Sequence, residues 1–155
     1  MKVLIIVSLV LAVTLQADAR VVINQDLPKV LRETAQQSFA CASQLGPDAA
    51  KLPKIENINS SQLPEDNPVL NRLWGCLWEK KGFIDKEGVV YPEKLKTYLV
   101  DLLSISPALN IDVEDTASKV TNKCKDVEGS DYKVKSIKMQ NCITKSVSEF
   151  VGTKK

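Results

Sequence analysis

The chain has 155 residues, of which 44% are hydrophobic, and a formal net charge of +2. That length suits a single domain with a buried core, and so mild a charge does not indicate nucleic acid or an acidic polymer as a partner. The sequence contains no histidine, which excludes histidine-assisted serine or cysteine nucleophiles and most zinc-dependent hydrolysis.

Residues 1–19 have the pattern of a secretory signal peptide. Lys2 supplies a positive charge, Val3–Leu15 is almost entirely apolar, and Ala17–Ala19 offers small residues for a signal peptidase. An apolar run of about 13 residues is too short to span a bilayer, which needs roughly 20. We therefore expect cleavage after this segment, no membrane insertion, and a secreted, extracellular domain of residues 20–155.

Apolar residues recur at three- and four-residue steps from Leu27 to Leu45, which predicts an amphipathic helix. Gly46-Pro47 ends this helix, and the apolar segment from Ala49 to Ile55 predicts one or two further turns. Residues 56–68 are rich in Asn, Ser, Asp and Pro and predict a surface loop, with a possible glycosylation sequon at Asn59. The inward stripe of the first helix consists of Leu27, Val30, Leu31, Thr34, Ala35, Ser38, Cys41, Ala42 and Leu45.

The middle of the chain predicts two more helices separated by a turn. The first covers Val69–Trp78, and Gly82 closes it. Phe83–Gly88 lacks the alternating oxygen ligands and the closing glutamate of a calcium loop, so we interpret it as a polar turn held by its two apolar residues. Pro92 suits the first position of the next helix, whose apolar face runs from Leu95 to Leu103.

Two further helices complete the chain. Acidic side chains within Asp112–Asp115 favour a helix start, and the apolar stripe that follows runs from Val113 to Val127. Gly129–Asp131 predicts a turn before the last helix, whose apolar arc lies within Met139–Val151. No strand-like alternation of useful length is present. The sequence therefore predicts an all-α fold of about six helices.

The four cysteines stand at Cys41, Cys76, Cys124 and Cys142. In a small exported domain this number predicts two disulfides, and the sequence alone allows three pairings. A zinc site is not indicated, because no two cysteines have the short spacing of a metal knuckle.

Catalysis is not indicated by the acidic residues. Glu65-Asp66 and Glu114-Asp115 are adjacent in sequence, and neighbours at that spacing point to different faces of a helix. Helix capping and solvation explain these pairs better than a shared substrate does. No glycine-rich phosphate loop is present. We expect no catalytic residues, no metal and no cofactor.

The inward stripes contain many aliphatic and aromatic side chains, among them Trp74, Trp78, Phe83, Tyr98 and Phe150. Such stripes usually form a filled core, but pockets between amphipathic helices are lined by the same residue types. Periodicity alone does not separate a filled core from a ligand cavity.

The order of these features resembles the insect odorant-binding proteins of the pheromone and general odorant type. The chain has a signal peptide, about six helices, one cysteine in the first, one in the third, and two flanking the last turn. The segment Cys76–Gly88 is similar to that family's pattern of a cysteine, a helix end, Gly-Phe, Asp and Gly. Tyr91–Leu95 follows at the position of the family's fourth helix. The similarity spans essentially the whole mature chain.

The chain departs from the usual members, which have six cysteines. Counting from their spacing, the second and fifth cysteines would fall at Arg72 and Lys133. Those two cysteines bond each other in the family, so their joint absence is what a four-cysteine subgroup should show. The third helix is then tied to the last only by packing, which favours a looser cavity and a broader choice of ligands.

The resemblance implies the disulfides Cys41–Cys76 and Cys124–Cys142, an internal hydrophobic cavity, no catalysis and no metal. It makes Tyr98 the best candidate for a polar contact with a ligand, the alternative being a hydroxyl bonded to backbone or water. The expected cavity lining is Leu73, Trp74, Leu77, Trp78, Phe83, Leu95, Tyr98, Leu99, Leu102, Ile143, Val147 and Phe150.

The function implied by the resemblance is a secreted carrier that solubilises odorants, pheromones or similar small hydrophobic ligands. It would act as a monomer or weak dimer, with an odorant receptor as a further partner. Many members release their ligand in acid. Because this chain has no histidine, any pH switch must use carboxylates and act at lower pH. We therefore expect nearly constant ligand binding between about pH 6 and 8. A second hypothesis is a secreted gland, haemolymph or venom protein of the same fold that acts on a protein partner.

Overall fold

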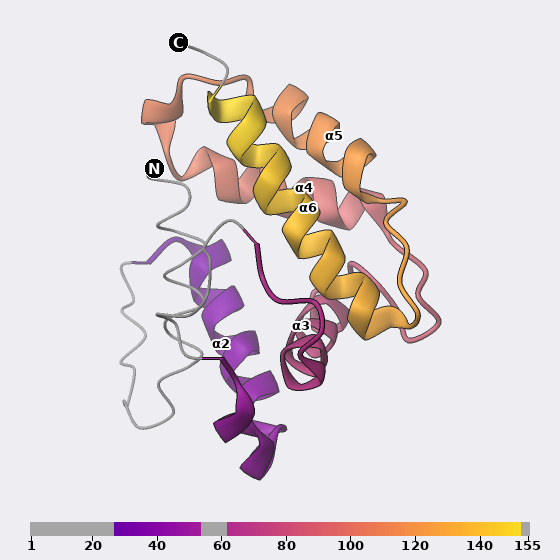
Figure 1. The fold of residues 1–155 in the computed structure, drawn as a ribbon. Coiled ribbons are helices and arrows are strands. Elements are labelled where there is room, and N and C mark those ends of the chain that lie inside the picture. The colour runs from indigo at the N-terminus through magenta and orange to yellow at the C-terminus, as the bar shows by residue number, and fades with distance from the viewer. Residues whose placement is uncertain (1–26, 54–61, 153–155) are drawn as a thin grey trace.

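The computed structural model describes residues 27–53 and 62–152, and every regular element in these ranges is helical (Figure 1). An isolated antiparallel bridge between Ile84 and Val90 is the one extended pairing in the described ranges. The all-α prediction is confirmed. The elements are α2 (Lys29–Ser43), the 3-10 helix η1 (Gly46–Lys51), α3 (Pro68–Lys80), α4 (Pro92–Ser104), the 3-10 helix η3 (Pro107–Leu109), α5 (Val113–Cys124) and α6 (Tyr132–Gly152).

Two prolines begin helices in places where the sequence suggested otherwise. The short helix expected from Ala49 instead starts at Gly46, because Pro47 occupies its first turn and the fixed φ of proline suits that position. Pro68, which we expected to lie in a loop, is the first residue of α3. The side chain of Asn67 caps that helix by accepting hydrogen bonds from two of its first free N–H groups.

The turn between α3 and α4 is held by its apolar residues, as predicted. Phe83 and Ile84 are 3% and 1% exposed. Gly82 has φ +71°, a conformation that favours glycine because it has no Cβ. The Asp85 carboxylate accepts hydrogen bonds from the backbone N–H of Val89 and the hydroxyl of Tyr91, and these bonds close the turn.

Both C-terminal helices begin with an aspartate cap. The Asp112 side chain accepts a hydrogen bond from the backbone N–H of Asp115 at the start of α5, and Asp131 caps α6 in the same way. Helix α5 ends at Cys124, earlier than its predicted stripe. Val127 therefore lies beyond the helix, in the turn that leads to α6.

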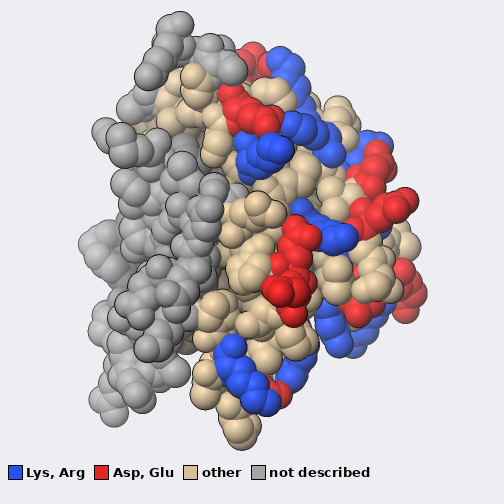
Figure 2. Space-filling view, viewed as in Figure 1, with Lys and Arg blue, Asp and Glu red and all other residues tan. Residues whose placement is uncertain are grey.

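Helix α6 packs against both α3 and α5, α5 packs against α4, and α2 packs against α3 and α4. In Figure 1, α6 is the long yellow helix that runs diagonally from near the C-terminus down to the side of α3. Over the described part of the face drawn in Figure 2, Lys and Arg side chains are interspersed with Asp and Glu side chains, with no large patch of one sign.

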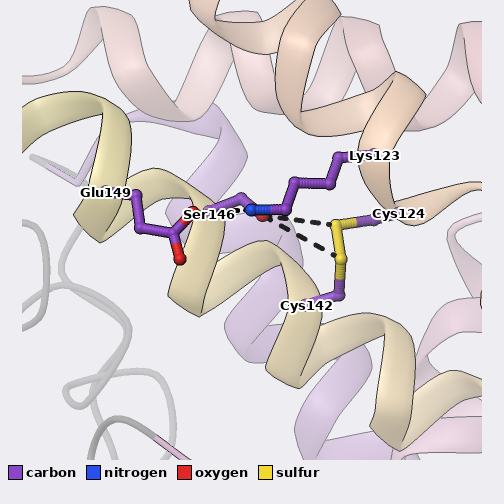
Figure 3. The surroundings of a disulfide bond; sticks show 5 residues. All are labelled: Lys123, Cys124, Cys142, Ser146 and Glu149. Carbon is purple, nitrogen blue, oxygen red and sulfur yellow. Dashed lines mark hydrogen bonds and ion pairs between the residues drawn. A yellow bond between two sulfur atoms is a disulfide. The ribbon is translucent and has the colours of Figure 1, made fainter.

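The two disulfides join neighbouring helices with the pairing that the resemblance implied. Cys41–Cys76 links α2 to α3, and Cys124–Cys142 links the end of α5 to α6. Figure 3 shows the second bridge, with the Ser146 hydroxyl 3.7 Å from the Cys124 sulfur. The ion pair between Lys123 and Glu149, at 2.6 Å, joins the same two helices beside it.

The core contains most of the predicted inward residues, but one of them is exposed, and α6 adds buried polar residues that were not predicted. Leu27, expected on the inward stripe of the first helix, is 39% exposed, because α2 begins only at Lys29 and Leu27 precedes it. Helix α6 buries five polar side chains that its apolar arc did not predict: Ser136, Gln140, Asn141, Thr144 and Ser146. No helix within the described ranges is both long and apolar enough to cross a membrane.

Candidate ligand-binding cleft

A cleft of about 490 Å³ opens to solvent between the first half of α2, the end of α3 and the length of α4. Its position follows from the turn after α3, which brings Phe83 and then α4 back against α2. The lining combines apolar, polar and charged side chains. These are Pro28, Lys29, Val30, Glu33, Gln37, Lys80, Lys81, Phe83, Lys94, Thr97, Tyr98, Asp101, Ser104 and Ile105.

The apolar wall of the cleft is the outer edge of an aromatic cluster. The rings of Phe83 and Tyr98 lie 5.1 Å apart, centroid to centroid, and both line the cleft. Phe83 also packs on Trp78 at 5.1 Å, and Trp78 on Trp74 at 5.0 Å. Aromatic surface therefore continues from the cleft into the core between α3 and α4.

A half-buried cation lies beside this aromatic wall. The Lys81 ammonium donates a 2.7 Å hydrogen bond to the Thr34 hydroxyl and stands 4.4 Å from the centroid of the Tyr98 ring. Burial lowers the pKa of Lys81 to about 8, against the opposing attraction of the Glu33 carboxylate. Within the described residues no carboxylate lies within ion-pairing distance of Lys81.

Tyr98, the predicted polar contact, is placed with its ring facing this cation. Burial raises the pKa of the Tyr98 phenol, and hydrogen bonding with Thr34 acts in the opposite direction. The hydroxyl groups of Tyr98 and Thr34 and the Lys81 ammonium thus form one polar group at the edge of the aromatic surface.

Some buried polar atoms of the cleft lining and of the aromatic cluster have no hydrogen-bond partner among the described residues. The side-chain oxygen of Gln37, which lines the cleft, is one, and the indole nitrogens of Trp74 and Trp78 are two more. Buried polar groups are usually paired. These atoms leave donors and an acceptor available close to the aromatic surface.

The structure divides the twelve residues predicted to line a cavity into three groups. Phe83 and Tyr98 line the cleft, while Phe150 and Leu102 are half-buried outside its lining. The other eight lie in the buried core: Leu73, Trp74, Leu77, Trp78, Leu95, Leu99, Ile143 and Val147. Asn59 lies outside the described residues.

The sequence pattern did not predict the polar residues of the cleft, above all Lys81. A signal was present, because Lys81 follows Leu77 and Trp78 by four and three residues. Those intervals place it on the same helical face as two core residues, at the point where the helix ends. Lys80, one residue earlier, is exposed.

These observations define a class: small helical proteins tied by two disulfides, with an aromatic-walled cleft beside the core. The chain matches the model of the PBP/GOBP family over residues 24–146, and it belongs to that insect odorant- and pheromone-binding family. Its four cysteines fit the form of the family that lacks the second and fifth. Comparisons with curated proteins and with solved structures found no match to either.

Proposed function

We propose that this protein is a secreted carrier that binds small hydrophobic ligands and keeps them dispersed in water. The observation that carries the proposal is the cleft between α2, α3 and α4, whose Phe83–Tyr98 wall continues as aromatic surface toward the core. Membership of a family of odorant- and pheromone-binding proteins supports it. An apolar ligand would lie on that wall and reach toward Trp78.

The energetics of such binding are sufficient. Removing about 500 Å² of apolar surface from water, ligand and cleft wall together, contributes roughly 12 kcal/mol at 25 cal/mol per Å². Part of this offsets the lost freedom of the ligand, and the unpaired polar atoms near the cleft can add hydrogen bonds. Dissociation constants in the micromolar range, which correspond to about 8 kcal/mol, are therefore expected.

The cellular part of the proposal concerns residues outside the described ranges. Residues 1–19 would be removed during export, leaving residues 20–155 as the extracellular domain. Two disulfides suit an oxidising export route. The carrier would act as a monomer or weak dimer and deliver its ligand to an odorant receptor. It would use no catalytic group, metal or cofactor.

Displacement of a polarity-sensitive dye tests the carrier function. N-phenyl-1-naphthylamine should fluoresce when bound to the protein, and decanol and decyl acetate should displace it at micromolar concentrations. Val30 lines the cleft, so Val30→Trp should narrow the cleft. The decanol concentration needed to displace the dye should then rise about tenfold or more. Val89, which is 53% exposed and lies outside the cleft lining, offers the matched control Val89→Trp, which should leave displacement unchanged.

Two outcomes would contradict this proposal. If a folded protein bound no apolar probe, a secreted protein that acts on a protein partner would be favoured instead. Equal binding by Val30→Trp and Val89→Trp would place the ligand away from the cleft.

A further inference from the structure

We propose that the cleft selects amphiphiles with a carboxylate head group, and that the Lys81 ammonium binds this head group as an ion pair. The inference rests on the proposed carrier function and adds the class of ligand. It is carried by the position of one lysine relative to the aromatic wall and to the other charges of the cleft.

Lys81 forms no ion pair in the described part of the chain, and the attraction of the Glu33 carboxylate only partly offsets its burial. Other lysines on the surface pair with carboxylates, for example Lys119 with Asp115 at 2.6 Å. In the cleft itself Glu33 lies 3.7 Å from Lys29, on the same helix. A half-buried cation has lost part of its hydration, so an incoming anion gains more from it than from a solvated lysine.

The surroundings of the cleft favour an anion over a cation. Four lysines line it against two carboxylates, so the local charge is positive. The charged and titratable groups around Lys81 are Lys29 and Glu33 of α2, Lys80 at the end of α3, and Lys94, Tyr98 and Asp101 of α4.

The geometry at Lys81 suits one end of an elongated ligand. An ammonium has three N–H donors, and Thr34 accepts one of them. A carboxylate can accept the remaining donors in charge-assisted hydrogen bonds, which are stronger than those to a neutral alcohol or ester. Phe83 and Tyr98, at the same end of the cleft, provide an apolar surface for the first part of the hydrocarbon chain.

The closing experiment compares three ligands of matched chain length: decanoate, decanol and methyl decanoate. Each ligand is titrated at pH 7 into the full secreted chain with dye bound, and the readout is the loss of dye fluorescence. We expect decanoate to bind about tenfold more tightly than decanol or methyl decanoate. This factor corresponds to the greater strength of a hydrogen bond to a charged group than to a neutral one. Lys81→Met should abolish this preference and keep the affinity for decanol, while Lys81→Arg should retain the preference.

The matched control is Lys145→Met, which removes an exposed lysine of α6 outside the cleft lining and should leave the preference for decanoate intact. A preference that survives Lys81→Met in a folded protein, or that disappears in Lys145→Met, would overturn the assignment to Lys81. If decanol binds and decanoate has no advantage in the wild type, the head-group proposal fails while the carrier function stands. If no probe binds at all, both fail.

A pH series on the wild-type protein tests the same ion pair without a variant. The pKa of free Lys81 is about 8, and a bound carboxylate raises it, so the complex holds the proton more tightly. Binding is then strongest below pH 8 and weakens as pH rises through 8. Affinity for decanoate should fall about twofold between pH 6 and 8 and about tenfold between pH 6 and 9. Affinity for decanol should stay constant; a parallel fall for both ligands would contradict the proposal.

Discussion

Asn141 connects the segment before α3 to the middle of α6. Its side-chain oxygen accepts a 2.7 Å hydrogen bond from the backbone N–H of Leu63, and its side-chain nitrogen donates to the Leu63 carbonyl at 3.0 Å. The same nitrogen donates to the Glu65 carboxylate. One amide thus satisfies both backbone groups of a buried residue that belongs to no helix or strand.

Replacing Asn141 by leucine should lower the free energy of unfolding by about 2–3 kcal/mol. The variant leaves the buried N–H and C=O of Leu63 without partners, and each such group costs about 1–3 kcal/mol. Urea denaturation followed by circular dichroism measures the change. Ser148→Ala is the control, because Ser148 is exposed and its hydroxyl bonds only within α6; it should change stability by less than about 0.5 kcal/mol. Equal losses in the two variants would contradict this role of Asn141.

Among the helices, α3 and α6 approach closely where Gly75 faces Lys133. A Cβ added at Gly75 would lie 2.8 Å from Cγ and 3.1 Å from Cα of Lys133. The second distance involves backbone, so the helices themselves would have to separate. The absence of a side chain at Gly75 therefore sets the distance between the two helices.

Gly75→Ala should destabilise the protein, although the same change in a free helix stabilises it by about 1 kcal/mol. Overpacking against the Lys133 backbone costs about 1–3 kcal/mol, which outweighs the gain in helix propensity. The midpoint temperature of thermal unfolding shows whether the variant is less or more stable than the wild type. Gly152→Ala, in the last residue of α6, meets nothing within 4 Å and should be neutral or stabilising. A higher midpoint for Gly75→Ala would show that the two helices move apart at no cost.

The helices could be predicted because each has a clear apolar period and clear end signals. Gly46, Gly82, Asp112 and Asp131 mark boundaries through conformational freedom or capping, which are local properties of the chain. Pro47 has two local roles, ending one helix and starting another, and only the structure shows both.

The cleft was less predictable, because it depends on contacts between helices that lie far apart in sequence. By its position at the end of a helix, Lys81 resembles an exposed lysine, yet α2 and α4 pack beside it and bury part of its side chain. Asn141 likewise resembles a surface residue until Leu63 packs beside it. The twelve predicted lining residues were chosen as inward-facing, and inward faces supply the core as well as the cleft wall.

For the whole molecule, the two disulfides leave the junction of α3 with α6 without a covalent tie. Cys41–Cys76 joins α2 to α3, and Cys124–Cys142 joins α5 to α6. The junction of α3 with α6 depends on packing, and Arg72 and Lys133 stand there at the positions matched to the missing cysteines. Arg72 instead forms an ion pair with Asp48 of η1 at 2.8 Å.

The double variant Arg72→Cys/Lys133→Cys should form a third disulfide in the oxidised protein. Lys133 lies against Gly75, one helical turn from Arg72, so the two new cysteines would face the same junction. Closing this long loop should raise the free energy of unfolding by about 3 kcal/mol, reduced by loss of the exposed Arg72–Asp48 pair. Thiol titration under denaturing conditions detects the bond, and urea denaturation with and without reductant measures the gain.

Arg72→Ser/Lys133→Ser is the matched control for this prediction, since it removes both basic side chains without providing a crosslink. Its stability should stay within about 1 kcal/mol of the wild type, because exposed ion pairs contribute little. The looser junction expected of a four-cysteine chain also predicts that the new bond narrows the range of ligands that displace the dye. Two free thiols in the cysteine variant would mean that the two positions do not face each other closely enough to bond. A bond that leaves stability unchanged would mean that packing already fixes α3 against α6 as firmly as a covalent tie.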